Sequence, residues 1–150
     1  MIGEERMAAV SALVSDYQFG YTEVGSTMDL KEFNAIINRP KNLRYEYFVK
    51  KAAATEIIWG LYDEGWAMTT DSEGLPLLPL WPKSEFAQHS ALGNWSGCSG
   101  RPLDLLAFMD KILPRLAEDG VRLSVFPNNI DSEIADADLL LVDLQSALKK

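Results

Sequence analysis

The sequence contains one cysteine, Cys98, and one histidine, His89, in 150 residues. A lone cysteine excludes an intramolecular disulfide and fits a reducing compartment. Two such residues cannot form the common zinc sites, which need three or four protein ligands. The acidic residues at 63–64, 71–73 and 118–119 lie in predicted turns and helix ends, where they have a local role. The sequence therefore predicts no metal site, and it contains no cofactor motif.

Basic residues are also few, since 14 Lys and Arg stand against 22 Asp and Glu, a formal net charge of −8. Nucleic-acid affinity depends on clustered Lys and Arg that neutralise phosphates, so this balance argues against a nucleic-acid partner. The acidic surface has two interpretations. It is a solvated face that keeps the protein in solution, or it matches a basic protein partner that is steered towards it.

Long hydrophobic runs are absent as well. No apolar stretch approaches the roughly 20 residues needed to cross a bilayer. The N-terminus does not resemble a signal peptide, because Glu4 and Glu5 stand where basic residues would precede the apolar segment. These absences predict a cytoplasmic protein with no membrane partner.

The chain has the length of one ordinary domain, and local signals place a boundary near Met28. Asp29 and Glu32 form a capping box directly ahead of an apolar stripe with helical spacing. These start signals are stronger than any that precede them. We therefore expect residues 1–27 to be a peripheral N-terminal extension and residues 28–150 to be a single domain.

Apolar residues at helical spacing predict five helices in this domain. They begin after Asp29, after Asn42 and at Pro82, and they cover about 103–118 and 136–148. Pro114 lies inside the fourth helix and removes the hydrogen bond to the Asp110 carbonyl. We expect a kink there.

Alternating apolar residues and turn signals predict the strands. Residues 56–62, 66–70 and 75–80 are separated by turns at 63–65 and 71–74, which is typical of a β-meander. Pro76 and Pro79 cannot donate to a ladder, so the third strand should lie at an edge or pair irregularly. Residues 93–100 read as a loop, and 121–125 as a later strand. Because strands joined by hairpins are antiparallel, the predicted class is α+β: a small antiparallel sheet, made of the β-meander plus one later strand, packed with about five helices.

Large aromatic residues are candidates for a recognition surface. Trp59 shares one strand face with Ile57 and Leu61, which predicts a core position. Four others combine a large apolar area with a polar group, as binding hot spots do: Tyr62, Trp66, Trp81 and Trp95. Packing in the core is the alternative interpretation for each of them.

Catalytic motifs are missing. Cys98 and His89 are residue types that serve as nucleophile and base, but no third residue is placed to orient them. The glycines are isolated, so no phosphate-binding loop opens a helix. The sequence therefore predicts no catalytic residue. An enzyme that acts on a small molecule through carboxylates, Tyr62, His89 or Cys98 stays as the alternative to a binding module.

An acidic run precedes and enters the last predicted helix. Within 13 residues that contain no Lys or Arg it has Asp131, Glu133, Asp136, Asp138 and Asp143. Acidic side chains near a helix N-terminus are favourable, yet five exceed what one helix start needs, and the excess repels itself unless a cation lies nearby. We therefore expect the first four to contact a basic protein partner.

Several spaced motifs resemble a known family. They are Arg44-Tyr45-Glu46-Tyr47-Phe48, Trp59-Gly60-Leu61-Tyr62, Pro79-Leu80-Trp81-Pro82, Glu118-Asp119-Gly120 and Val125-Phe126-Pro127. In this order, over about residues 29–148, they are similar to the small bacterial family DUF2750, a domain of unknown function. The resemblance implies a stand-alone bacterial domain and assigns no catalytic residue.

The resemblance also implies a Gly-containing turn and a further strand after Pro127. Residues 128–133 are short and Gly-free here, which disfavours that strand. Among the functions open to such a domain, an inhibitor-like or immunity-type protein-binding module best fits the aromatic hairpin and the acidic run.

Overall fold

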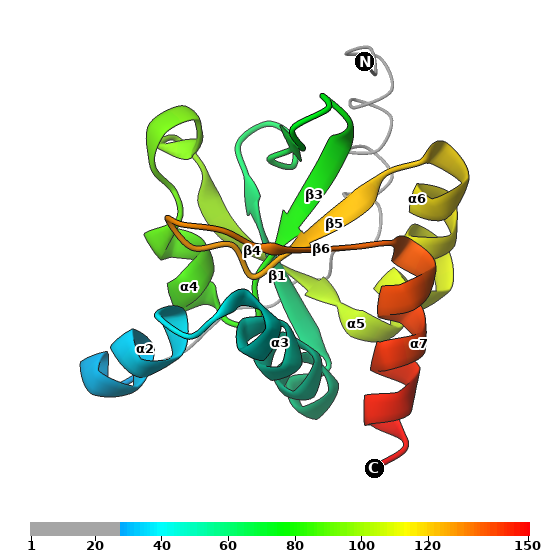
Figure 1. Cartoon of the computed structure of the whole chain (residues 1–150), viewed down its shortest axis with the longest axis horizontal. Coiled ribbons are helices and arrows are strands. Elements are labelled where there is room, and N and C mark those ends of the chain that lie inside the picture. The colour runs from blue at the N-terminus through cyan, green and yellow to red at the C-terminus, as the bar shows by residue number, and fades with distance from the viewer. Residues whose placement is uncertain (1–27) are drawn as a thin grey trace.

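The structure is a computed structural model that describes residues 28–150, so the expected extension, residues 1–27, lies outside the described residues. Figure 1 shows the arrangement of the elements, and helices together with two small sheets confirm the α+β class. In chain order the elements are α2 (Leu30–Ile37), α3 (Lys41–Thr55), β1 (Ile57–Tyr62), β2 (Thr69–Thr70), β3 (Pro76–Leu80), α4 (Ser84–His89), the 3₁₀ helix η1 (Gly93–Trp95), β4 (Ser99–Asp104), α5 (Leu105–Ala107), the π-helix η2 (Phe108–Ile112), α6 (Leu113–Asp119), β5 (Arg122–Val125), β6 (Glu133–Ala135) and α7 (Ala137–Leu148).

Of the five predicted helix starts, those of α2 and α7 agree with the structure, and the other three differ from it by about two residues. The Asp29 carboxylate caps α2 and accepts a hydrogen bond from the Lys31 amide at 3.1 Å. Asp136 occupies the N-cap of α7. The expected cap at Asn42 is wrong, because Pro40 precedes the first residue of α3. Proline suits a helix start, since its fixed φ is close to helical and it has no N–H to leave unpaired.

Strand β1 pairs with β4 in an antiparallel ladder over its whole length. The expected pairing of β1 within a β-meander is therefore wrong, because residues 99–104 form a strand where we expected the end of a loop and the start of a helix. Only an isolated bridge joins Tyr62 to Trp66. The six-residue β4 satisfies more of the backbone groups of β1 than the two-residue β2 can.

The second sheet has the strand order β2-β3-β5-β6, and β3 pairs antiparallel with β2 and parallel with β5. Its prolines had predicted an edge position, but β3 lies inside the sheet. The Leu80 carbonyl accepts from the Phe126 amide at 2.8 Å, so the nitrogen of Pro79 faces the other side. On that side β3 pairs with β2, but the antiparallel β2 reaches only as far as Thr69, which lies opposite Leu77. Pro79 lies beyond this point, so its missing N–H removes no ladder bond.

Trp59 and Trp81 join the two sheets. The amide of each donates to the carbonyl of the other, at 2.9 and 2.8 Å. The indole Nε1 of Trp81 also donates to the Pro127 carbonyl at 3.0 Å. Trp59 is 7% exposed, so its predicted core position is confirmed, and Trp81 is completely buried. One hydrophobic core thus spans both sheets.

The helical segment 105–119 accommodates Pro114 through a π turn. The π-helix η2 occupies Phe108–Ile112, and Pro114 then stands in the first turn of α6. Because η2 runs directly into α6, Pro114 lies within a continuous helical segment, and its missing N–H leaves one carbonyl of the preceding turn without a helical donor. The expected irregularity is present, and the inserted π turn ahead of the proline is its form.

The segment after β5 turns back without a glycine. Phe126 has a φ of +51°, and the Asn128 side-chain oxygen accepts from the amides of Ile130 and Asp131 at 2.9 and 3.0 Å. This asparagine closes the turn that we expected to need glycine. Strand β6 then pairs antiparallel with β5, so the expectation against a strand here is wrong.

Arg44 is a charged side chain at the centre of this arrangement, with 1% of its surface exposed. Its Nε donates to the Phe126 carbonyl at 3.0 Å, and Nη1 donates to the Arg39 carbonyl at 2.6 Å. Its Nη2 donates to both the carbonyl and the carboxylate of Asp131, at 2.7 and 2.6 Å. The guanidinium therefore ties α3 to the end of α2 and to the turn between β5 and β6.

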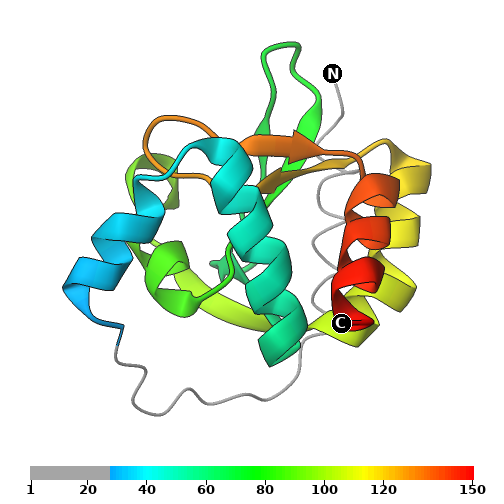
Figure 2. The same ribbon diagram turned by 60° about the horizontal axis from the view of Figure 1, so that its bottom comes forward.

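Helix α3 packs against β1, β5, β6 and α7. Figures 1 and 2 show α3 and α7 next to each other, with β6 leading into the start of α7. Among residues 28–150, no helix is long and apolar enough to cross a membrane.

The turn between β2 and β3 depends on one carboxylate. Asp71 accepts from the amides of Glu73 and Leu75 at 2.8 and 2.9 Å and pairs with Arg122 of β5. The Leu75 amide is the largest cause that lowers the pKa of Asp71, and the Glu73 amide and Arg122 lower the pKa further. The ionised carboxylate therefore favours the folded state.

We predict that Arg44→Ala lowers the free energy of unfolding by about 3–5 kcal/mol, because the buried Phe126 carbonyl and the partly buried carbonyls of Arg39 and Asp131 lose a charged donor. Arg44→Lys should not restore it, since an ammonium lacks the planar fork. Asp131→Ala is the matched control and should cost about 1 kcal/mol, because the Asp131 carbonyl still accepts. Urea unfolding measures all three variants. A near-neutral Arg44→Ala would show that water satisfies these carbonyls.

We also predict a pH-dependent effect of Asp71→Asn. Because the folded-state pKa is lowered, the stability contributed by the charge is present above the unfolded pKa of about 3.9 and is lost as the pH falls through the folded pKa. The stability difference between wild type and Asp71→Asn should therefore be largest near neutral pH and shrink in acid. Urea titrations from neutral to acid pH test this, with Glu73→Gln in the same turn as control. A pH-independent difference would contradict the charge-based account.

Candidate functional site

The aromatic candidates do not form an exposed patch. Trp66 is 4% exposed and Trp81 is fully buried, so the packing interpretation describes both and their proposed role in a recognition surface is corrected. Trp66 packs on β1 so closely that a Cβ at Gly60 would lie 2.7 Å from its ring. Tyr62 and Trp95 are half-buried, and Trp95 stacks edge-on against Trp81 at 6.0 Å between ring centroids.

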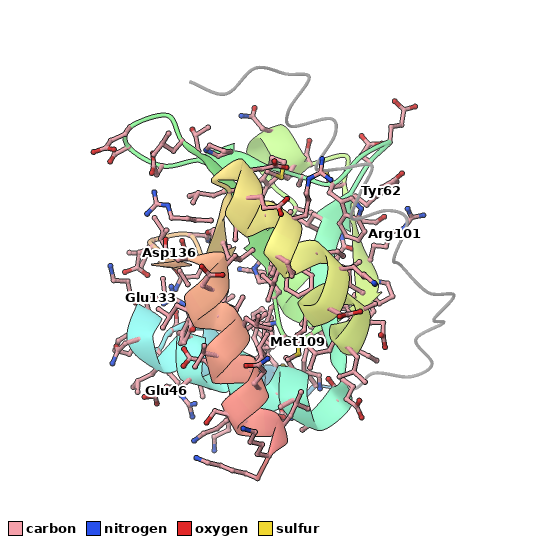
Figure 3. All side chains as sticks on the ribbon, turned by 90° about the vertical axis from the view of Figure 1, so that its right-hand side faces the viewer. Glu46, Tyr62, Arg101, Met109, Glu133 and Asp136 are labelled. Carbon is pink, nitrogen blue, oxygen red and sulfur yellow. The ribbon has the colours of Figure 1, made fainter. Side chains whose placement is uncertain are left out.

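Tyr62 is half-buried, and one face of its ring is already covered. The Arg101 guanidinium lies 3.8 Å from the ring centroid, which is a cation–π contact. Figure 3 shows this pair well apart from Glu133 and Asp136. The aromatic hairpin and the acidic run are therefore separate regions of the surface.

Cys98 and His89 are held by different neighbours. His89 ends α4 and packs edge-on against Phe33 at 5.2 Å between centroids. Burial raises the pKa of the Cys98 thiol, and the negative charge of Asp63 raises that pKa further. A nucleophilic cysteine needs the opposite shift. No group of three His, Cys, Asp or Glu side chains within residues 28–150 could hold a metal ion.

The acidic run divides into two groups. Asp131 pairs with the buried Arg44, although 43% of its own side chain is exposed. The Asp143 carboxylate accepts from the Tyr45 hydroxyl at 2.5 Å. Glu133, Asp136 and Asp138 form no ion pair with any residue of the described chain. These three carboxylates leave their charge directed to solvent.

The Tyr45–Asp143 hydrogen bond joins α3 to α7. Burial is the main cause that raises the pKa of Tyr45, and the bond to Asp143 and the charges of Asp143 and Glu133 raise it as well. The tyrosine therefore stays protonated and keeps donating at any physiological pH. This bond lies in the wall of a hollow between α3, β6 and α7.

That hollow, the α3–α7 groove, has a volume of about 870 Å³ and is lined by one face of α3, by β6 and by one face of α7. Most of its lining is apolar, from Val49, Ala53, Ile134, Ala135, Leu139 and Leu148. Charged side chains at its margin include Glu46, Glu133 and Lys150. The groove is large enough for a ligand or a peptide segment.

Sequence reasoning did not find this groove, although one signal was available. Residues 139–142 are four consecutive apolar residues in a helix, and one helix face cannot bury all of them. In the structure Leu140 is buried, whereas Leu139 and Val142 are 54% and 58% exposed. Surplus apolar residues of this kind indicate a surface that can make further contacts.

The fold and the groove define a small α+β domain whose most developed surface feature is a hollow between two helices. A family model described as "Protein of unknown function (DUF2750)" matches residues 45–147, which is more than half of the chain. The chain therefore belongs to this family, as its motifs predicted. The match begins within α3, so it includes the groove lining except Asn42, Leu148 and Lys150, and it leaves out α2. No curated protein and no solved structure matches the chain.

We predict that Cys98 reacts slowly with iodoacetamide at neutral pH. The pH dependence of the rate should give a pKa above the ordinary value of about 8.5. Asp63→Asn should lower this pKa only in part, because burial is the larger cause. A pKa below the ordinary value would contradict this prediction and would restore Cys98 as a candidate nucleophile.

Proposed function

We propose that this protein is a binding module that docks a basic protein surface through Glu133, Asp136 and Asp138. The supporting observation is that these three neighbouring carboxylates have no cation partner in the described chain, while Asp131 and Asp143 on either side of them do have internal partners. Figure 3 shows Glu133 and Asp136 beside the start of α7.

The helix start explains only part of this charge. Asp136 is the N-cap of α7 and Asp138 lies in its first turn, and both favour the positive end of the helix dipole. Glu133 lies on β6, where no helix dipole accounts for it. A surplus negative charge beside two others is unfavourable unless an external cation neutralises it. A basic partner would supply that cation.

The proposed mode of action is that of an inhibitor-like or immunity-type protein in the bacterial cytoplasm, which occupies the basic surface of its partner. Charges at the rim of such an interface chiefly raise the association rate and make it sensitive to salt. The aromatic hairpin has no part in this surface, because its tryptophans are buried or half-buried. The raised pKa of Cys98 disfavours the enzyme alternative.

We predict that the triple variant Glu133→Gln, Asp136→Asn and Asp138→Asn associates about 3–10-fold more slowly with such a partner at low ionic strength. Asparagine keeps the N-cap, so the fold should be unchanged. Partners captured from a lysate of the source organism are identified, purified and measured by surface plasmon resonance over a salt series.

The control for this prediction removes the same charge elsewhere on the surface. Glu64→Gln, Glu73→Gln and Glu118→Gln change three exposed acidic side chains outside the β6–α7 region. This control variant should keep the wild-type association rate and salt slope. Equal association rates and salt slopes for both triple variants would show that Glu133, Asp136 and Asp138 are only a solvated surface.

A further inference from the structure

We propose that the α3–α7 groove binds an amphipathic helix of the basic partner, with its apolar side in the groove and its Lys- or Arg-rich C-terminal turn at the β6 end. This inference rests on the proposed function, and it names the part of the partner that docks. Helix-in-groove binding is a common mode of peptide recognition.

The groove has the shape and chemistry for a helix. Leu139, Leu148 and Ile134 are 54%, 36% and 40% exposed, although each is a large apolar side chain lining the hollow. Leu139 and Leu148 lie nine residues apart on α7, a separation of about 14 Å. Two to three turns of a helix cover that distance. On the α3 side, Ala53 and Ala54 are small and let a neighbouring backbone approach.

The hydrogen-bonded pair Tyr45 and Asp143 in the wall of the groove is compatible with an apolar ligand. The Tyr45 hydroxyl donates to Asp143, so a bound helix that excludes water leaves this hydroxyl paired. A helix that covered an unpaired buried hydroxyl would lose binding energy. The groove can therefore take an apolar helix face without requiring a polar group in the middle of that face.

The charges around the groove differ between its two ends. Glu133 lines the end where β6 leads into α7, and Asp136 and Asp138 lie at that same end of the helix. Lys150 lines the other end, next to Lys149. A helix that carries acidic residues in its first turn and basic residues in its last turn, the arrangement its own dipole favours, matches these charges when it runs antiparallel to α7.

The test uses two designed peptides of about 18 residues, long enough to span the groove at 1.5 Å per residue. Both carry the same Leu and Ala residues on one helix face. One has Glu in the first turn and Lys in the last turn, and the other has these charges exchanged. Binding to the full chain is followed by fluorescence anisotropy at low and high salt.

We predict that the peptide with C-terminal Lys binds at least about fivefold more tightly at low salt, and that the preference shrinks at high salt because exposed charge pairs are screened. Leu139→Ser should weaken both peptides about tenfold, because an apolar anchor is lost. Leu106→Ser is the matched control, since Leu106 is 51% exposed and lies outside the groove, and it should bind both peptides as wild type does.

Four outcomes would overturn the inference. Equal binding of both peptides, or equal effects of Leu139→Ser and Leu106→Ser, would show that the groove does not select a helix of this polarity. A dimer that Leu139→Ser dissociates in analytical ultracentrifugation would show that a second copy occupies the groove. A basic partner that needs Glu133, Asp136 and Asp138 but does not compete with either peptide would overturn the groove inference and leave the proposed function intact.

Discussion

The rest of the structure depends on the buried guanidinium of Arg44. Its planar fork donates to three carbonyls, one after α2 and two in the turn between β5 and β6, and to one carboxylate, which an ammonium could not do in a fixed geometry. The contact holds α3 against the turn that follows β5, and this turn directs the chain into β6 and then α7. Together with the Tyr45–Asp143 hydrogen bond, this contact sets the relative positions of α3 and α7, which form the α3–α7 groove.

The tryptophans organise the interior and leave recognition to other residues. The mutual hydrogen bonds of Trp59 and Trp81 join a two-stranded and a four-stranded sheet, neither of which closes a core alone. Trp66 lies against the bare backbone of Gly60, which no other residue could provide without a clash. A hairpin that resembles a binding hot spot in sequence is thus a packing element in three dimensions.

The acidic residues show how one stretch of charge serves two purposes. Asp131 and Asp143 each accept from a partner on α3, and so they help to position α3 against β6 and α7. Glu133, Asp136 and Asp138 stand between them with their charge unpaired by the described chain. The internal pairs make the groove rigid, and the unpaired carboxylates give one of its ends a negative charge. Rigid placement of this kind favours binding, because little ordering is needed when a ligand arrives.

Local sequence alone determined most of the helices, although not all of their ends. The cap at Asp29 and the approximate start of α7 follow from interactions within a few residues, so spacing along the chain reveals them. The class of fold and the core position of Trp59 followed in the same way from periodicity, and the family from spaced motifs. The tertiary structure decided what depends on distant residues. Pairing of β1 with β4, the strand β6, the burial of Arg44 and the groove beside Leu139 each need partners that lie far apart in sequence. A local pattern shows which residues are apolar, whereas only the folded chain brings groups that are distant in sequence into contact.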